Sequence, residues 1–118
     1  MRNDRLSRET AESLVEELIT SGGFTYPRPP KTGYMVGGFG KRYMFSLDTY
    51  EYKEIRNAII DVFVTNDIAD YVGGWKGPIS MEVEGSRHYL TRDMAIIAAK
   101  RNKQLAIYDL RRCESVTL

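Results

Sequence analysis

Two glutamates spaced two residues apart are the side chains in this sequence best arranged for chemistry. Glu82 and Glu84 fall in an alternating run, so they share one face of a strand and lie roughly 7 Å apart. Two carboxylates at that separation are compatible with the acid and base of a glycoside hydrolase. Alternation produces the same spacing on any solvated strand face, so we interpret both glutamates as outward-facing and solvent-exposed.

The chain has a single histidine, His88, and a single cysteine, Cys113. A catalytic triad needs a base held beside a nucleophile, and closeness in sequence between Ser86 and His88 does not provide that geometry. A zinc site built from one histidine and one cysteine would need two carboxylates as well. We therefore predict no catalytic residue, no metal site and no cofactor, and we keep a small enzyme with a site near His88 and Glu82 as the third functional hypothesis.

The glycine-rich stretch at 37–41, Gly-Gly-Phe-Gly-Lys, is similar to a phosphate-binding loop. The match fails at two positions, because Met35 stands where the first glycine is needed and Arg42 stands where Ser or Thr is needed. A strand-like run follows, whereas a phosphate loop precedes a helix. The stretch therefore predicts an ordinary turn that joins two strands in a hairpin.

Basic residues are concentrated toward the C-terminal end of the chain. Positions 71–118 hold 8 Lys and Arg against 5 Asp and Glu, although the net charge of the whole chain is only +1. Together with nearby tyrosines, such residues could bind nucleic acid through phosphate contacts and base stacking. Nucleic-acid binding is thus the second hypothesis, and its basic residues are Lys100, Arg101, Lys103, Arg111 and Arg112.

Eight tyrosines and one tryptophan suggest an interaction surface, because these side chains bury large areas at low entropic cost. Trp75 lies in a glycine-rich segment, where it is either a core anchor at a sheet edge or an exposed contact residue. A protein partner is therefore the first hypothesis. The candidate binding residues for both hypotheses are Trp75, Tyr89, Tyr108, Arg111, Arg112, Lys100 and Arg101.

Three stretches with apolar residues at helical spacing predict helices at about 7–20, 48–66 and 91–102. Ser7 is expected to cap the first helix, and Asp48 with Glu51 resembles a capping box for the second. The residues expected to form the packing face of the third helix are Met94, Ala95, Ile97 and Ala98.

Alternating apolar residues predict strands at about 24–26, 34–36, 41–47, 79–84, 105–110 and 114–118. In the fourth of these, Ile79, Met81 and Val83 should point inward. A turn at 111–113 should join the last two strands. These elements predict an α+β fold, with a small, mostly antiparallel sheet and about three helices packed mainly on one face.

Composition limits the remaining possibilities. The 118 residues are 42% hydrophobic and 28% charged, which is ordinary globular composition and enough for one core. We expect a single domain over 1–118, with a flexible start at 1–6. One cysteine cannot form an internal disulfide, and no apolar run approaches the ~20 residues of a membrane span. We expect a cytoplasmic protein without a membrane partner, and a homo-oligomer stays an open alternative.

Four segments occur in an order that resembles a known group of proteins. They are Gly-Gly-Phe-Thr-Tyr at 22–26, Thr-Gly-Tyr-Met-Val at 32–36, Gly-Gly-Trp at 73–75 and Asn-Lys-Gln-Leu-Ala-Ile-Tyr-Asp-Leu at 102–110. The set resembles small accessory proteins of actinobacterial phages and integrated mobile elements, over most of the chain from about residue 22. The resemblance implies a genomic context and carries over no functional residues.

These observations lead to one expected function. We expect a non-catalytic phage or mobile-element protein that binds and modulates a host protein or complex, for example as an anti-defence inhibitor in the host cytosol. That expectation follows from the resemblance and from the tyrosine-rich composition.

Overall fold

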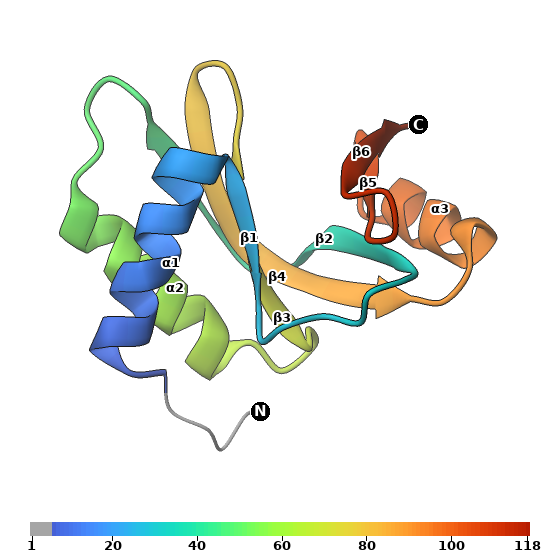
Figure 1. Ribbon diagram of the computed structural model, residues 1–118, viewed down its shortest axis with the longest axis horizontal. Coiled ribbons are helices and arrows are strands. Elements are labelled where there is room, and N and C mark those ends of the chain that lie inside the picture. Colours follow the sequence, from blue (N-terminus) through green and yellow to red (C-terminus); the bar gives the residue numbers. More distant parts are fainter. Residues whose placement is uncertain (1–5) are drawn as a thin grey trace.

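The computed structural model describes residues 6–118, which form three helices and six strands (Figure 1). The flexible start that we expect at 1–6 lies outside the described residues, except for Leu6, which is buried in the core. In chain order the elements are α1 (Arg8–Ser21), β1 (Gly23–Tyr26), β2 (Tyr34–Ser46), α2 (Tyr52–Thr65), β3 (Tyr71–Lys76), β4 (Ser80–Tyr89), α3 (Arg92–Arg101), β5 (Ala106–Asp109) and β6 (Glu114–Thr117).

The six strands form one sheet in the order β1-β3-β4-β2-β5-β6, and every neighbouring pair is antiparallel. The predicted α+β class is therefore confirmed. The sheet is strongly curled: in Figure 1 the β5–β6 hairpin stands opposite β1 and the upper part of β4. The first and last strands of the order, β1 and β6, are consequently brought toward each other across a concave face.

Strand β2 corrects the predicted hairpin. The glycine-rich stretch does not reverse the chain but lies within one strand of 13 residues that pairs with β4 along most of its length. The register shifts between Val36 and Phe39 and again between Phe39 and Arg42. Each shift is a bulge that adds bend and twist to the strand. The glycines therefore curve the sheet where a turn was predicted.

The bulges depend on glycine because the backbone is crowded there. Gly38 and Gly40 have positive φ values of 85°, which favour glycine strongly. On the opposing strand, a Cβ at Gly85 would overlap the carbonyl oxygen of Phe39 and the side chain of Asn66. Asn66 is itself buried, and its Nδ2 donates a hydrogen bond of 2.5 Å to that same carbonyl oxygen. The amide thus satisfies a backbone group that the bulge removes from the ladder.

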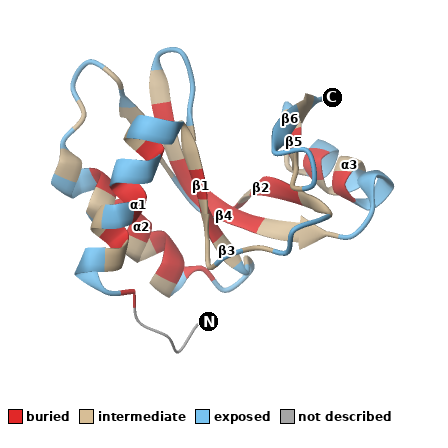
Figure 2. Cartoon of the chain, viewed as in Figure 1, coloured by how far each residue is buried: buried red, intermediate tan, exposed pale blue. Residues whose placement is uncertain are grey.

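One hydrophobic core lies between the sheet and the helices α1 and α2. Ser7 caps α1 as predicted, with its Oγ accepting from the backbone N–H of Thr10. Figure 2 shows the buried face of both helices turned toward the strands. The fully buried side chains of this core include Val15, Leu18, Ile55, Ile59, Val62, Val72, Met81 and Val83.

A second, smaller core lies beneath α3, which begins after Thr91 as an N-cap. Ala95 and Ala99 are fully buried there, against Val36, Phe39 and Ile107. The predicted packing face of α3 is correct for Ala95 and for the partly buried Ala98, and wrong for Met94 and Ile97, which are more than half exposed. The small alanines allow the helix to approach the bulged part of β2, and this rotates the larger side chains outward.

All three helices cover the same face of the curled sheet. Cross-strand partners share a face, and the outer face of β2 and β4 carries both cores. The pairs on this face are Val36 with Arg87, Phe39 with Gly85, Tyr43 with Val83, and Phe45 with Met81. The predicted placement of the helices on one face is therefore observed, and no helix within residues 6–118 covers the concave face.

Two further local expectations are wrong, one at the start of α2 and one at the start of β4. Asp48 does not open α2, because the chain first makes a turn at Ser46 and the helix begins after Glu51, which makes no side-chain capping bond. Ile79 is exposed, because it lies just before β4, at the margin of the sheet where no helix covers it.

The crowding at the bulge gives a direct test. We expect Gly85→Ala to lower the free energy of unfolding by about 2–3 kcal/mol, because the new methyl group must displace the Phe39 carbonyl or the Asn66 amide. Gly77→Ala is the matched control, since its Cβ would lie 3.5 Å from the nearest atom, an ordinary contact. Chemical denaturation measures both variants, and equal effects would contradict the proposed crowding.

Candidate binding pocket on the concave face

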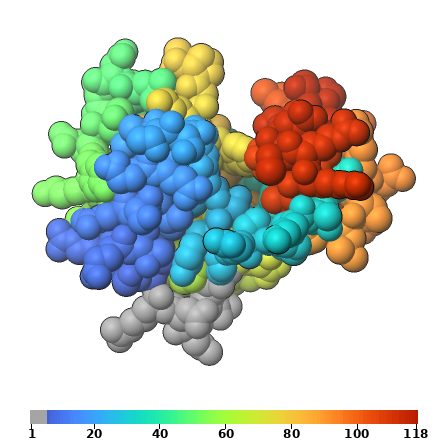
Figure 3. Space-filling model, in the orientation of Figure 1, coloured from blue at the N-terminus to red at the C-terminus, as the bar shows by residue number. Residues whose placement is uncertain are grey.

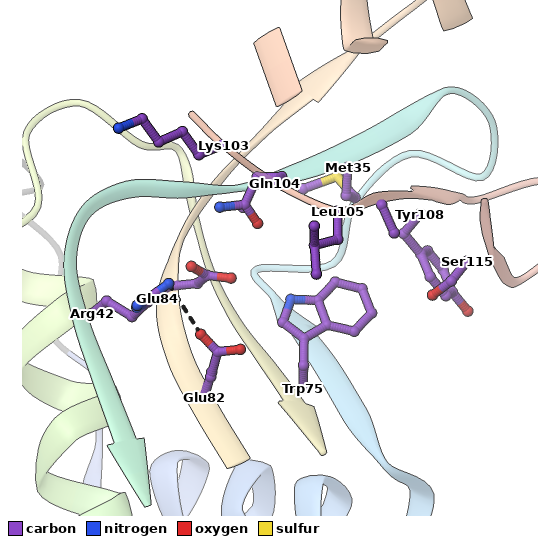
Figure 4. A pocket seen from close by; sticks show the side chains of 12 residues that line it. Met35, Arg42, Trp75, Glu82, Glu84, Lys103, Gln104, Leu105, Tyr108 and Ser115 are labelled. Carbon is purple, nitrogen blue, oxygen red and sulfur yellow. Dashed lines mark ion pairs between the residues drawn. The ribbon is translucent and has the colours of Figure 1, made fainter. Parts of the chain in front are cut away.

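A cavity of about 280 Å³ opens on the concave face of the sheet. Figure 3 shows the surface hollowed between the segment that carries α1 and β1 and the C-terminal hairpin. Figure 4 shows the lining side chains, which come from the five strands β2 to β6 and from the segment after α3. They include Met35, Arg42, Trp75, Glu82, Glu84, Lys103, Gln104, Leu105 and Tyr108.

An aromatic contact spans this pocket. The rings of Trp75 on β3 and Tyr108 on β5 have centroids 5.5 Å apart and are tilted by 54°. Two strands, β4 and β2, separate β3 from β5 in the sheet order, so the contact exists only because the sheet curls. Both side chains are half-buried, which answers the open question on Trp75: it is a wall of the pocket rather than a core anchor.

Glu84 lies at the base of the pocket and corrects the prediction of a solvated glutamate. Its side chain is only 3% exposed, and its Oε1 has no hydrogen-bond partner. Burial raises the pKa of Glu84 to about 7, and the charge of Glu82 adds to the rise, whereas Arg42 and the backbone N–H of Gly38 oppose it. Near neutral pH, this carboxyl group can therefore hold or release a proton.

Glu82 lies beside Glu84 on the same strand face, as alternation predicts. Its Oε1 forms an ion pair of 3.3 Å with Arg42 on β2, drawn as the dashed line in Figure 4. This pair is partly exposed, so its contribution to stability is small. The pocket floor thus carries two carboxyl groups. Glu82 has a cationic partner, whereas Oε1 of Glu84 has no partner.

The rim is formed by the segment that follows α3. The carboxamide of Gln104 donates a hydrogen bond to the backbone oxygen of Asn102, which holds this segment in its bend. Leu105 is 84% exposed although it is a large apolar side chain at the mouth of the pocket. An exposed leucine beside an aromatic wall is the arrangement expected at a contact surface.

A groove continues from the pocket between the two ends of the sheet. Residues 22–25, on and just before β1, line one side, and residues 113–115, at the start of β6, line the other. Trp75 and Tyr108 form the boundary shared with the pocket. Because β1 and β6 are the end strands of the described sheet, each carries backbone groups that no further strand pairs.

The structure brings together only some of the residues predicted to bind. Trp75 and Tyr108 meet in the pocket, whereas Tyr89 packs against the core under α3. Arg111 and Arg112 lie in a separate hollow beside Arg92, at the start of α3. The remaining two predicted residues, Lys100 and Arg101, occupy the last turn of the same helix.

The single histidine and the single cysteine both lie outside the pocket. His88 lies on β4, and its Nε2 is 2.8 Å from the carbonyl oxygen of Thr32, which ties the strand to the loop before β2. Cys113 is exposed in the predicted turn between β5 and β6, where its φ is 54°. Over residues 6–118, no group of three or more His, Cys, Asp or Glu is arranged to hold a metal ion.

No protein-family model, no curated protein and no solved structure matches this chain. Within the part of the chain that the structure describes, no helix is long and apolar enough to cross a membrane. The interpretation of the concave face therefore depends on its own geometry.

The buried carboxyl group should make stability depend on pH. The folded-state pKa of Glu84 lies above its ordinary value, so ionisation favours the unfolded chain and stability is lost as pH rises through about 7. We expect the free energy of unfolding of the wild type to fall by about 2–3 kcal/mol relative to Glu84→Gln between pH 5 and pH 8.

Denaturation at several pH values measures this difference. Glu16→Gln is the control for the change in net charge, because Glu16 is an exposed residue of α1 on the helix-covered side. If the free energies of unfolding of the wild type and Glu84→Gln differ by the same amount at every pH in this range, the raised pKa of Glu84 is contradicted.

Proposed function

We propose that this chain is a non-catalytic accessory protein of a phage or mobile element, which binds a host protein or complex through its concave face. The observation that carries the proposal is the pocket that joins Trp75, Tyr108 and Leu105 to a buried carboxyl group with an unpartnered oxygen. Such a site combines apolar contact area with one polar group that fixes orientation. An anti-defence inhibitor acting in the host cytosol is one concrete form of this function.

Exposed apolar side chains support a macromolecular partner. Leu105 is 84% exposed at the pocket mouth, and Met44 is 58% exposed on β2. Met44 pairs with Glu82 across the strands, so it belongs to the same concave face as the pocket. Apolar contacts around a small polar centre are typical of the core of a protein interface.

The nucleic-acid hypothesis has less support. The guanidinium group of Arg112 is within 4.0 Å of carboxylate oxygens of both Asp109 and Glu114, which partly neutralise its charge. Phosphate binding depends on uncompensated positive charge. We therefore favour the concave face as the binding surface over the hollow that Arg111 and Arg112 line beside α3.

Two exposed leucines allow a matched test of the proposal. We expect Leu105→Glu to reduce the capture of a partner from an actinobacterial lysate at least roughly tenfold, because it places a charge in the apolar contact. Leu90→Glu is the control, since Leu90 is also 84% exposed but lies in the hollow with Arg111. Quantitative co-purification measures both.

The two substitutions distinguish the concave face from the hollow beside α3 as the binding surface. Loss of capture with Leu105→Glu alone supports the concave face, and loss with Leu90→Glu alone moves the binding surface to the other hollow. Capture that withstands both substitutions overturns the proposal, provided that circular dichroism shows both variants folded.

A further inference from the structure

We infer that the pocket binds the side chain of a lysine or arginine carried by an extended segment of the partner protein, with Glu84 as its acceptor. The inference rests on the proposed function and specifies the chemistry of the group that enters. It combines three independent features of the concave face, namely a buried carboxyl group with one unpartnered oxygen, an aromatic wall and the two end strands of the described sheet.

The first feature is the unsatisfied oxygen of Glu84 inside the pocket. Glu82 already has Arg42 as a partner, whereas Oε1 of Glu84 has no hydrogen bond although the residue is 97% removed from solvent. An unsatisfied buried oxygen carries a desolvation penalty. A cationic donor entering the pocket would remove that penalty and form a charge-assisted hydrogen bond with the carboxylate.

The second feature is the wall through which such a cation would pass. Lysine and arginine have apolar stems that can lie along Trp75 and Leu105, with the charged end directed to the floor. The faces of Trp75 and Tyr108 also attract cations. An anionic side chain has no hydrogen to donate to Oε1 of Glu84, so it would leave that oxygen unsatisfied.

The third feature is the groove that leads away from the pocket. It runs between residues 22–25 on one side and residues 113–115 on the other, and both belong to end strands of the described sheet. An extended segment can pair its backbone with such an edge, and alternate side chains then point into pockets beside it. The charged residues that line this groove are Glu17, Lys76 and Glu114, so carboxylates outnumber cations there.

Charges from each neighbouring element determine the response to pH. Glu82 comes from β4 itself, Arg42 comes from β2, and Lys103 comes from the segment after α3. Cation binding requires ionised Glu84, whose pKa is about 7 because of burial and the charge of Glu82. Affinity for a basic segment should therefore rise as pH increases through that value, by roughly tenfold between pH 6 and pH 8.

The experiment is a selection of short displayed peptides with randomised sequences, performed at pH 8 on the wild type and on Glu84→Gln. The wild type should select peptides with a lysine or arginine at one recurrent position, and Glu84→Gln should lose that preference. A selected peptide without tryptophan is then titrated against Trp75 fluorescence, beside its norleucine variant, which lacks the charge. We expect the charged peptide to bind at least roughly tenfold more tightly.

Glu16→Gln is the control and should select and bind like the wild type. Selection of peptides without a basic residue, no selection at all, or an affinity of the basic peptide that is equal at pH 6 and pH 8 would each overturn the inference. These failures differ from failure of the proposed function. A partner that is lost with Leu105→Glu, while selected peptides lack lysine and arginine, would leave the binding surface in place and refute only its cationic ligand.

Discussion

The close backbone approach between β2 and β4 at the bulges is the constraint on which the concave face depends. Glycine at 38 and 40 accepts positive φ, and Gly85 leaves room for the Phe39 carbonyl and the amide of Asn66. Without these bulges, strands β3 and β5 would remain separated by two flat strands, and Trp75 would not reach Tyr108. The curl, the aromatic contact and the pocket are therefore consequences of one local departure from regular pairing.

The position of Glu84 follows from the same departure. Gly37 on β2 has no side chain where a Cβ would overlap the glutamate carboxylate, so the bulge creates the space that the carboxyl group occupies. Burying a carboxyl group there without a partner for Oε1 reduces the stability of the fold. Buried titratable groups with unsatisfied atoms are frequent at functional sites. A ligand that supplies the missing hydrogen bond removes the desolvation penalty, and the free energy gained contributes to its binding.

Local features of this fold are readable from the sequence, whereas the site is not. Ser7 capping, the short strand at 24–26 and the turn at 111–113 depend on neighbouring residues, and the structure contains each of them. The glycines at 37–40 are compatible with both a turn and a bulge, and only the pairing of β2 with a distant strand distinguishes these. Alternation correctly places Glu82 and Glu84 on one strand face. It does not reveal that a curled sheet covers that face with a hairpin from the end of the chain.

The two faces of the sheet differ in what covers them, and this difference determines how the concave face can act. The outer face carries both cores and all three helices, so its residues are committed to stability. The inner face contributes little to either core, and its aromatic, acidic and exposed apolar side chains can vary in chemistry while the cores stay intact. A partner that places a cation against Glu84 would supply what folding leaves incomplete there. Binding would then stabilise the curled sheet through the same carboxyl group whose burial weakens it.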